Sequence, residues 1–373
     1  ICISLALLNF SVNAQKIQTG AERIDVYIPL LHNKNVAVVG NQSSIINQTH
    51  LVDSLLILNI NIVKVFSPEH GFRGSADAGE KIENEVDEKT GIPILSLYGK
   101  NKKPDVKQLE DVDILLFDIQ DVGARFYTYI STLHYVMESA AENNVKVIIL
   151  DRPNPNGHYI DGPIRENGFE SFVGMHPIPI VHGMTIGEYA RMINGEGWIA
   201  EKCDLDIIKM ENYNHDMHYN LTIKPSPNLP NSKSINLYPS LCLFEGTNIS
   251  VGRGTKYPFQ HFGAPYLKSN YSFTPRSTQG SKFPKYEDQK CFGTDLRFQD
   301  NYLTEINLDW LIYAYRNCPE KEQFFNKFFD KLAGTDKLKL QIISGENSKE
   351  IKNSWEEGLR EFKKTRSKYI IYN

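Results

Sequence analysis

The first part of the chain alternates short apolar runs with stretches in which apolar residues recur at helical spacing. The runs are rich in Val, Ile and Leu, which is typical of strands buried on both faces of a sheet. They lie at 35–39, 60–66, 93–98, 112–119 and 145–150. Helical spacing follows the first run, at 51–58, and the fourth, at about 127–143. The pattern predicts an α/β domain with a mostly parallel sheet covered by helices on both faces.

The pattern changes near Lys224. Residues 224–231 carry three prolines in eight positions, which suits a linker or an extended crossover. Turns and aromatic residues are frequent from there to about Asn307, and apolar residues return to helical spacing in 308–372. The 373 residues therefore predict two domains. We expect them at 15–230 and 231–373, the second being a smaller α+β domain.

The first ten residues are almost wholly apolar, and small residues up to Ala14 and the polar Gln15 follow them. This order is typical of the end of a signal peptide with cleavage after Ala14, although a buried N-terminal strand is also apolar. We expect 1–14 to be a signal-peptide remnant and the protein to be exported, to the periplasm or the cell exterior. An oxidising compartment would permit disulfides, with three alternative pairings, among Cys203, Cys242, Cys291 and Cys318.

Composition and motifs exclude several kinds of function. The formal net charge of −4, from 41 basic and 45 acidic residues, argues against a nucleic-acid partner held by phosphate contacts. No apolar run approaches the roughly 20 residues of a membrane span. The sequence lacks the glycine pattern of dinucleotide sites, the P-loop, the H-E-x-x-H zinc motif and the G-x-S-x-G nucleophile elbow. We therefore expect no cofactor, no metal and no stable membrane span.

Polar or charged residues follow each of the five predicted strands. Ligands of open parallel sheets bind just beyond the carboxyl ends of the strands. Surface loops are polar as well, so the clustering favours a site without proving one. The candidates from this edge are Asn41, Glu69, His70, Arg73, Asp118, Gln120, Asp121, Arg125, Asp151, Arg152 and Asn154.

Glu69 is the first candidate for a general acid. It follows Pro68, which fixes φ, and precedes Gly71, which permits a sharp turn, so the carboxyl group is presented on a defined backbone. Phenylalanines flank this turn, and a carboxyl group partly withdrawn from water holds its proton as a general acid must. The alternative is a capping carboxylate or a salt bridge with Arg73.

Asp118 and Asp121 are candidates for a second catalytic carboxylate. Both follow the fourth predicted strand, and glycoside hydrolysis usually needs a second carboxylate as base, nucleophile or stabiliser. The alternative for Asp118 is a salt bridge with Arg125 or Arg152 that organises the loops.

Five segments carry a family resemblance. They are SPEHGFRG (67–74), DIQDVGARFYTYISTLHYVM (118–137), LDRPNPNG (150–157), GMHPIPIVHGMTIGEYA (174–190) and PSLCLFEGTNISVGRGT (239–255). With them the chain resembles the exo-β-N-acetylmuramidase family of the NamZ type, from about Val36 to the C-terminus. The resemblance implies a Rossmann-like N-terminal domain, a C-terminal auxiliary domain and a site in the cleft between them. It also implies release of N-acetylmuramic acid from the non-reducing end of peptidoglycan fragments, with Glu69 as the catalytic glutamate.

This substrate class guides the choice of binding residues. The lactyl group of muramic acid carries a carboxylate, which a guanidinium grips with two hydrogen bonds. Tyr127 can stack on a sugar ring, and His70 and His182 can orient a carboxylate or bind hydroxyls. The binding candidates added to those of the sheet edge are Tyr127, His182, Glu245 and Arg253, and the arginine candidates for the lactyl carboxylate are Arg73, Arg125, Arg152 and Arg253.

Two other functions remain open at this point. A non-catalytic periplasmic protein that binds muropeptides or sugars in an interdomain cleft would have the same organisation. A hydrolase of an ester or amide bond is the third reading, although the chain has no nucleophile elbow and no zinc motif. The expected partners are peptidoglycan-derived saccharides or muropeptides.

Overall fold

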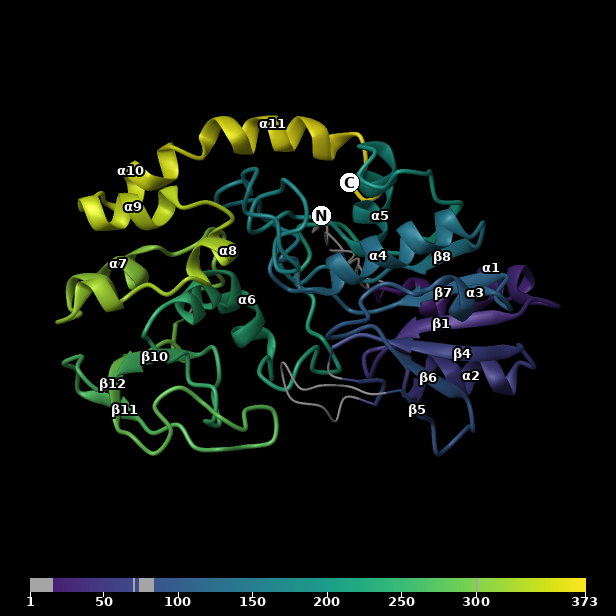
Figure 1. Ribbon diagram of the computed structural model, residues 1–373, viewed down its shortest axis with the longest axis horizontal. Helices are drawn as coiled ribbons and strands as arrows, with labels where there is room; N and C mark the ends of the chain where they lie inside the picture. Colours follow the sequence, from purple (N-terminus) through teal and green to yellow (C-terminus); the bar gives the residue numbers. More distant parts are fainter. Residues whose placement is uncertain (1–15, 70, 74–83, 300) are drawn as a thin grey trace, which may run out of the picture.

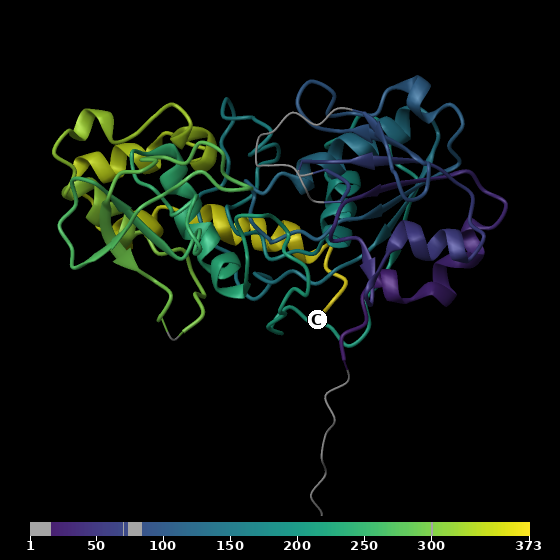
Figure 2. The ribbon, with the colours of Figure 1, turned by 90° about the horizontal axis from the view of Figure 1, so that it is seen from below.

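The computed structural model describes residues 16–69, 71–73, 84–299 and 301–373. The signal-peptide remnant expected at 1–14 and the candidate His70 lie outside these ranges. Two lobes lie side by side, one built on a large sheet and one on helices and a small sheet (Figures 1 and 2).

The large sheet has the order β5-β6-β4-β1-β7-β8-β9, and every neighbouring pair is parallel except β5 with β6. The five predicted strands all form, and the mostly parallel α/β prediction is confirmed. The short strands β5 and β9 were not predicted. The strands are β1 (Val36–Gly40), β4 (Ile62–Ser67), β5 (Glu85–Val86), β6 (Pro93–Ser96), β7 (Ile114–Asp118), β8 (Lys146–Leu150) and β9 (Leu205–Ile208).

Alternate residues of the central strands feed two separate cores. Val36 and Val38 of β1 belong to the core under α1 and α2, whereas Ala37 and Val39 belong to the larger core under α4 and α5. Both faces are therefore buried, which explains the unbroken apolar runs in the sequence. The elements around the sheet are η1 (Gly20–Glu22), α1 (Ile24–Leu31), β2 (Ile45–Ile46), β3 (Thr49–His50), α2 (Leu51–Ile57), α3 (Val106–Leu109), α4 (Tyr129–Glu142) and α5 (Ile186–Gly195).

The strand order places a topological switch at the centre of the sheet. From β1 the chain goes to β4 and β6 on one side, and then to β7 and β8 on the other. In open α/β sheets, the crevice at such a switch is where ligands bind, beyond the carboxyl ends of the strands. β4 ends at Ser67, so Glu69 emerges beside this switch.

The second lobe combines a three-stranded antiparallel sheet, ordered β10-β12-β11, with short helices. The helical spacing predicted for 308–372 is confirmed as five helices, α7 to α11. The elements are α6 (Ser232–Leu241), η2 (Cys242–Gly246), β10 (His261–Ala264), β11 (Tyr271–Phe273), β12 (Cys291–Asp295), α7 (Asp309–Arg316), η3 (Lys321–Gln323), α8 (Phe329–Ala333), α9 (Lys337–Ser344), α10 (Ser348–Asn353) and α11 (Glu356–Ser367).

The C-terminal segment ties the second lobe back to the first. Helix α11 runs from the side of α10 towards α5 (Figure 1). Beyond it, the Tyr372 hydroxyl donates to Asp151 Oδ2 at 2.7 Å, and the Ile371 N–H donates to Glu188 Oε1 at 2.8 Å. Two separate strands of chain therefore join the lobes, which limits how far the lobes can move apart.

The four cysteines from Cys203 onward are buried and free, so none of the disulfides considered from the sequence forms. Within the described ranges, no helix has the length and apolar character needed to cross a membrane.

Candidate active site

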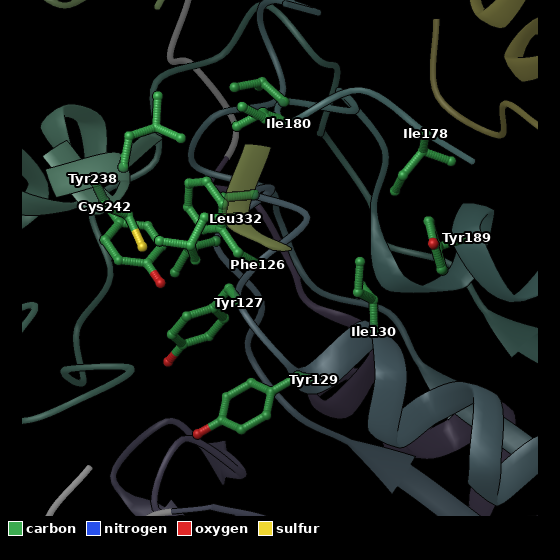
Figure 3. Close-up of a cluster of buried hydrophobic side chains, with 14 of the residues drawn as sticks. Phe126, Tyr127, Tyr129, Ile130, Ile178, Ile180, Tyr189, Tyr238, Cys242 and Leu332 are labelled. Carbon is green, nitrogen blue, oxygen red and sulfur yellow. The ribbon is translucent and has the colours of Figure 1, made fainter. Parts of the chain in front are cut away.

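A cleft of about 700 Å³ lies between the two lobes. Aromatic side chains from both lobes meet in it. Figure 3 shows Phe126, Tyr127 and Tyr129 facing Tyr238 and Leu332, with Cys242 beside them. At the mouth, the Phe283 side chain is 91% exposed. Such a lining suits a sugar, whose C–H faces pack on aromatic rings while its hydroxyls need polar partners.

Glu69 lines this cleft and is partly buried. The turn that presents it forms as expected, because Gly71 has φ 75° and its N–H donates to the Pro68 carbonyl at 3.2 Å. Phe66 and Phe72 on either side are buried in opposite cores, which anchors the turn at both ends. The carboxyl group therefore stands on a fixed backbone at the edge of the sheet.

Hydroxyl groups surround the Glu69 carboxylate. Thr128 Oγ1 donates to Glu69 Oε2 at 3.3 Å, and Tyr98 also hydrogen-bonds to this carboxylate. Burial raises the pKa of Tyr98 to about 12, and the negative charge of Glu69 adds to the shift. Tyr98 therefore stays a neutral hydroxyl beside the carboxyl group throughout the physiological pH range.

Behind this wall, Asn41 supports Tyr129. The Asn41 Nδ2 donates to the Tyr129 hydroxyl at 2.9 Å, and its Oδ1 accepts from the Ser43 hydroxyl at 2.6 Å. Tyr127 lines the cleft with its ring, and its hydroxyl donates to the Pro225 carbonyl at 2.7 Å. Asn41 thus acts through Tyr129 and is not itself a lining residue.

The facing wall comes from the second lobe and carries Glu245 and Arg253. Arg253 Nε donates to Glu245 Oε1 at 2.5 Å, and Nη2 donates to Oε2 at 3.1 Å. Both side chains are about one quarter exposed. The described part of the lining holds two carboxylates, Glu69 and Glu245, and the second is already paired with a cation.

Asp118 does not reach the cleft. It is fully buried, and both its oxygens accept from Arg152, at 2.5 Å from Nε and 2.8 Å from Nη2. Arg152 also donates to the Ile45 carbonyl at 3.0 Å. The structure thus shows the loop-organising ion pair considered from the sequence, and it places Asp118 and Arg152 together without Glu69.

Three further candidates at the sheet edge hold backbone together. Asp151 accepts from the Gly187 N–H at 2.9 Å and from the Thr185 hydroxyl at 2.7 Å, so it caps α5. The Gln120 side chain donates to the Pro153 carbonyl, and the Asn154 side chain donates to the Met184 carbonyl. All three are buried and outside the lining.

Asp121 and His182 form a buried polar pair behind the cleft wall. His182 Nε2 lies 3.9 Å from Asp121 Oδ2, too far for a hydrogen bond, and Asp121 Oδ1 lacks a partner among the described residues. Burial raises the pKa of Asp121 to about 7 and lowers that of His182 to about 3. A shifted carboxyl group often marks an active site, but this one is not among the lining residues.

Arg73 and Arg125 also have partners outside the cleft. Arg73 donates to Asp87 through Nε and Nη2, at 3.1 and 2.7 Å. Arg125 is 1% exposed and donates to four backbone carbonyls, two of them in α8 at Leu332 and Ala333. It therefore joins the lobes from the inside rather than facing a ligand.

The sequence prediction thus placed four of its candidates in the described cleft: Glu69, Tyr127, Glu245 and Arg253. It placed Tyr98 at a strand end without giving it a role, and it missed Thr128, Asn228 and Lys282, which also line the cleft. Thr128 directly follows Tyr127 in a segment already quoted for the resemblance. Asn228 and Lys282 lie in loops whose sequence gives no signal.

No group of three or more His, Cys, Asp or Glu side chains in the described ranges is arranged to hold a metal ion.

Comparisons with known proteins agree with this arrangement. Residues 36–233 match the family described as exo-beta-N-acetylmuramidase NamZ, N-terminal, and residues 236–372 match its C-terminal counterpart. A relative from Bacillus subtilis (strain 168), named peptidoglycan beta-N-acetylmuramidase NamZ, is 41% identical over 399 residues, covering 98% of this chain and 93% of its own.

Two crystal structures of DUF1343 family proteins from Bacteroides fragilis share the fold. Their TM-scores are 0.90 and 0.82, at 47% and 28% identity, and each comparison covers 96% of this chain and 99% of the other. The family matches cover nearly all of 36–372, and the Bacillus relative is similar along almost the whole chain. The chain therefore belongs to the exo-beta-N-acetylmuramidase NamZ family.

Proposed function

We propose that this protein is an exo-acting glycosidase that releases N-acetylmuramic acid from the non-reducing end of peptidoglycan fragments, with Glu69 as general acid. The observation that carries the proposal is the Glu69 carboxyl group, fixed on a turn at the topological switch and opening into an aromatic cleft. The relative from Bacillus subtilis is named for β-N-acetylmuramidase activity on peptidoglycan.

The chemistry asks for a proton at the glycosidic oxygen. Cleavage passes through an oxocarbenium-like state, and a sugar leaving group departs as an alkoxide unless an acid protonates it. Glu69 supplies the proton, while the Thr128 hydroxyl holds its Oε2. The aromatic walls exclude water and pack on the sugar, which keeps the reacting oxygen in place.

The test compares two disaccharides that differ only in order, MurNAc–GlcNAc and GlcNAc–MurNAc, with mass spectrometry of the products. The proposal expects free MurNAc from the first and no cleavage of the second. Binding of both without cleavage would instead support the non-catalytic muropeptide binder. Cleavage of the second disaccharide would exclude an exo-muramidase.

We also propose that the protein acts outside the cytoplasm, in the periplasm or beyond. The apolar segment 1–10 followed by small residues supports this, as does the location of peptidoglycan itself. Cell fractionation with N-terminal sequencing of the mature protein tests it. The expected result is an envelope or secreted fraction beginning near Gln15, and an unprocessed cytoplasmic protein would contradict it.

A further inference from the structure

Four arginines were candidates for the carboxylate of the muramic lactyl group, and the structure separates them. Arg152 is held by Asp118, Arg73 by Asp87, and Arg125 by four backbone carbonyls. Arg253 is the candidate whose side chain lines the cleft. The question is then whether its surroundings leave it able to bind a second anion.

The turn that carries Arg253 is fixed by the glycines on either side. Gly252 and Gly254 have φ 75° and 77°, a region that other residues rarely adopt. A Cβ at Gly252 would lie 2.0 Å from the His261 ring, and one at Gly254 would lie 2.4 Å from the Arg276 carbonyl oxygen. Neither glycine is replaceable without moving the turn, so the backbone of Arg253 is held in one position.

Two neighbours orient the guanidinium group. Glu245 takes the edge formed by Nε and Nη2, and the Phe259 ring lies with its centroid 5.1 Å from the Arg253 Cζ. Phe259 is fully buried and has φ 54°, an unfavourable conformation for a bulky residue that persists only where the surroundings enforce it. The strain thus lies directly beneath the group that faces the cleft.

The opposite edge of the guanidinium remains open. Among the described residues, no acceptor takes a hydrogen bond from Arg253 Nη1, although the side chain is 25% exposed. A guanidinium has five N–H donors, so pairing with Glu245 leaves enough for a second carboxylate. Lys282 also lines the cleft, and together with Arg253 and Glu245 it gives this wall an excess of positive charge.

We propose that Arg253 binds the lactyl carboxylate of N-acetylmuramic acid and that Glu245 is the residue that positions it. The inference rests on the proposed function, because it names the substrate group that the second lobe recognises. N-acetylglucosamine lacks the lactyl ether, so this contact separates the two sugars. A site built to pair with a buried carboxylate rejects a ligand that lacks it.

The experiment measures kcat/KM on an aryl β-N-acetylmuraminide, on its lactyl amide and on the corresponding glucosaminide. In the wild type, the muraminide is preferred over both. In Arg253→Met, the ratio of muraminide to lactyl amide falls by about 10- to 150-fold, the usual worth of a hydrogen bond to a charged group. Arg253→Lys keeps the charge without the fork and falls in between.

Arg297 provides a matched control. It pairs with Asp295 in the same lobe through the same two nitrogens, at 2.9 and 2.7 Å, but does not line the cleft. Arg297→Met should leave the ratio unchanged. Glu245→Gln should raise KM for the muraminide more than it lowers kcat, and restore less of the preference than the wild type. An unchanged ratio in Arg253→Met, or an equal fall for all three substrates, overturns the proposal.

Calorimetry of free MurNAc and GlcNAc keeps this test independent of catalysis. The wild type should bind MurNAc more tightly, and Arg253→Met should bind the two sugars alike. If the wild type binds with this preference but cleaves nothing, the proposed function fails and the assignment of Arg253 stands. If the wild type cleaves muraminides and Arg253→Met keeps its MurNAc preference, the assignment of Arg253 fails. If Arg253→Met does not fold, the comparison of Arg253→Lys with wild type decides in the same way.

Discussion

Glu69 beyond β4 and Asp118 at the end of β7 are carboxylates on the same edge of one sheet, on either side of β1. Glu69 opens into the cleft beside hydroxyl groups, whereas Asp118 is fully buried against Arg152. The first can exchange a proton with a ligand, and the second serves the fold. Position at the carboxyl edge is therefore not enough for chemistry, because the partner that each carboxylate meets decides its use.

The largest expected effect is at Glu69. Glu69→Gln should lower kcat/KM on MurNAc–GlcNAc by about 10²- to 10⁴-fold, the usual contribution of a general acid. The unfolding midpoint should stay where it is, because the amide still accepts from Thr128. Glu110→Gln, an exposed glutamate outside the cleft, is the control and should match the wild type. A fully active Glu69→Gln would remove the contrast between the two carboxylates.

Asp118 should show the opposite behaviour. Asp118→Asn leaves the buried Arg152 guanidinium without its anion, which should reduce the free energy of unfolding by about 3–5 kcal/mol. Denaturant unfolding measures this. Removing the exposed partner of another ion pair, in Glu305→Gln, should leave the midpoint unchanged. A stable Asp118→Asn protein with lost activity would mean that Asp118, not Glu69 alone, takes part in the reaction.

Arg125 extends the comparison from a carboxylate to a cation. Burial lowers its pKa to about 9, so it remains charged at neutral pH and is balanced by four carbonyl acceptors. Arg125→Met leaves these carbonyls without a donor and should destabilise the protein by about 2–4 kcal/mol. Equilibrium unfolding measures the change. If stability is unaffected while substrate affinity is lost, Arg125 belongs to the ligand after all.

Asp121 should give the smallest effect, visible in the pH dependence of stability. With its pKa raised from 3.8 to about 7 by burial, the folded protein binds this proton more tightly than the unfolded chain. The free energy of unfolding should therefore decrease as the pH rises from about 4 to about 7. Asp121→Asn should remove part of this slope and gain about 1–2 kcal/mol at high pH.

Thermal unfolding of wild type and Asp121→Asn across this range measures the slope. Part of it should remain in the variant, because burial also raises the pKa of Asp151, to about 6. Identical pH profiles for the two proteins would show that Asp121 is ionised in the folded state, and that its surroundings are more polar than the structure indicates.

The fold was largely predictable, because the strands that were found are long and wholly apolar. Strand β9 was missed because its four residues include Asp206. Glu69 was also predictable, since Pro68 and Gly71 define its turn locally. The fates of the arginines were not, because the partners are distant in sequence. The acceptors of Arg125 in α8 lie 207 and 208 positions away, and no local pattern reports such a contact.

The central claim, that Glu69 protonates the leaving group, is tested most directly by varying that group. Aryl β-N-acetylmuraminides ranging from a weakly acidic phenol to a dinitrophenol are compared in wild type and Glu69→Gln by kcat/KM. The account predicts that the loss in the variant is large for the weakly acidic phenol and nearly vanishes for the dinitrophenol, which departs without a proton. A loss that is the same for every leaving group would contradict it.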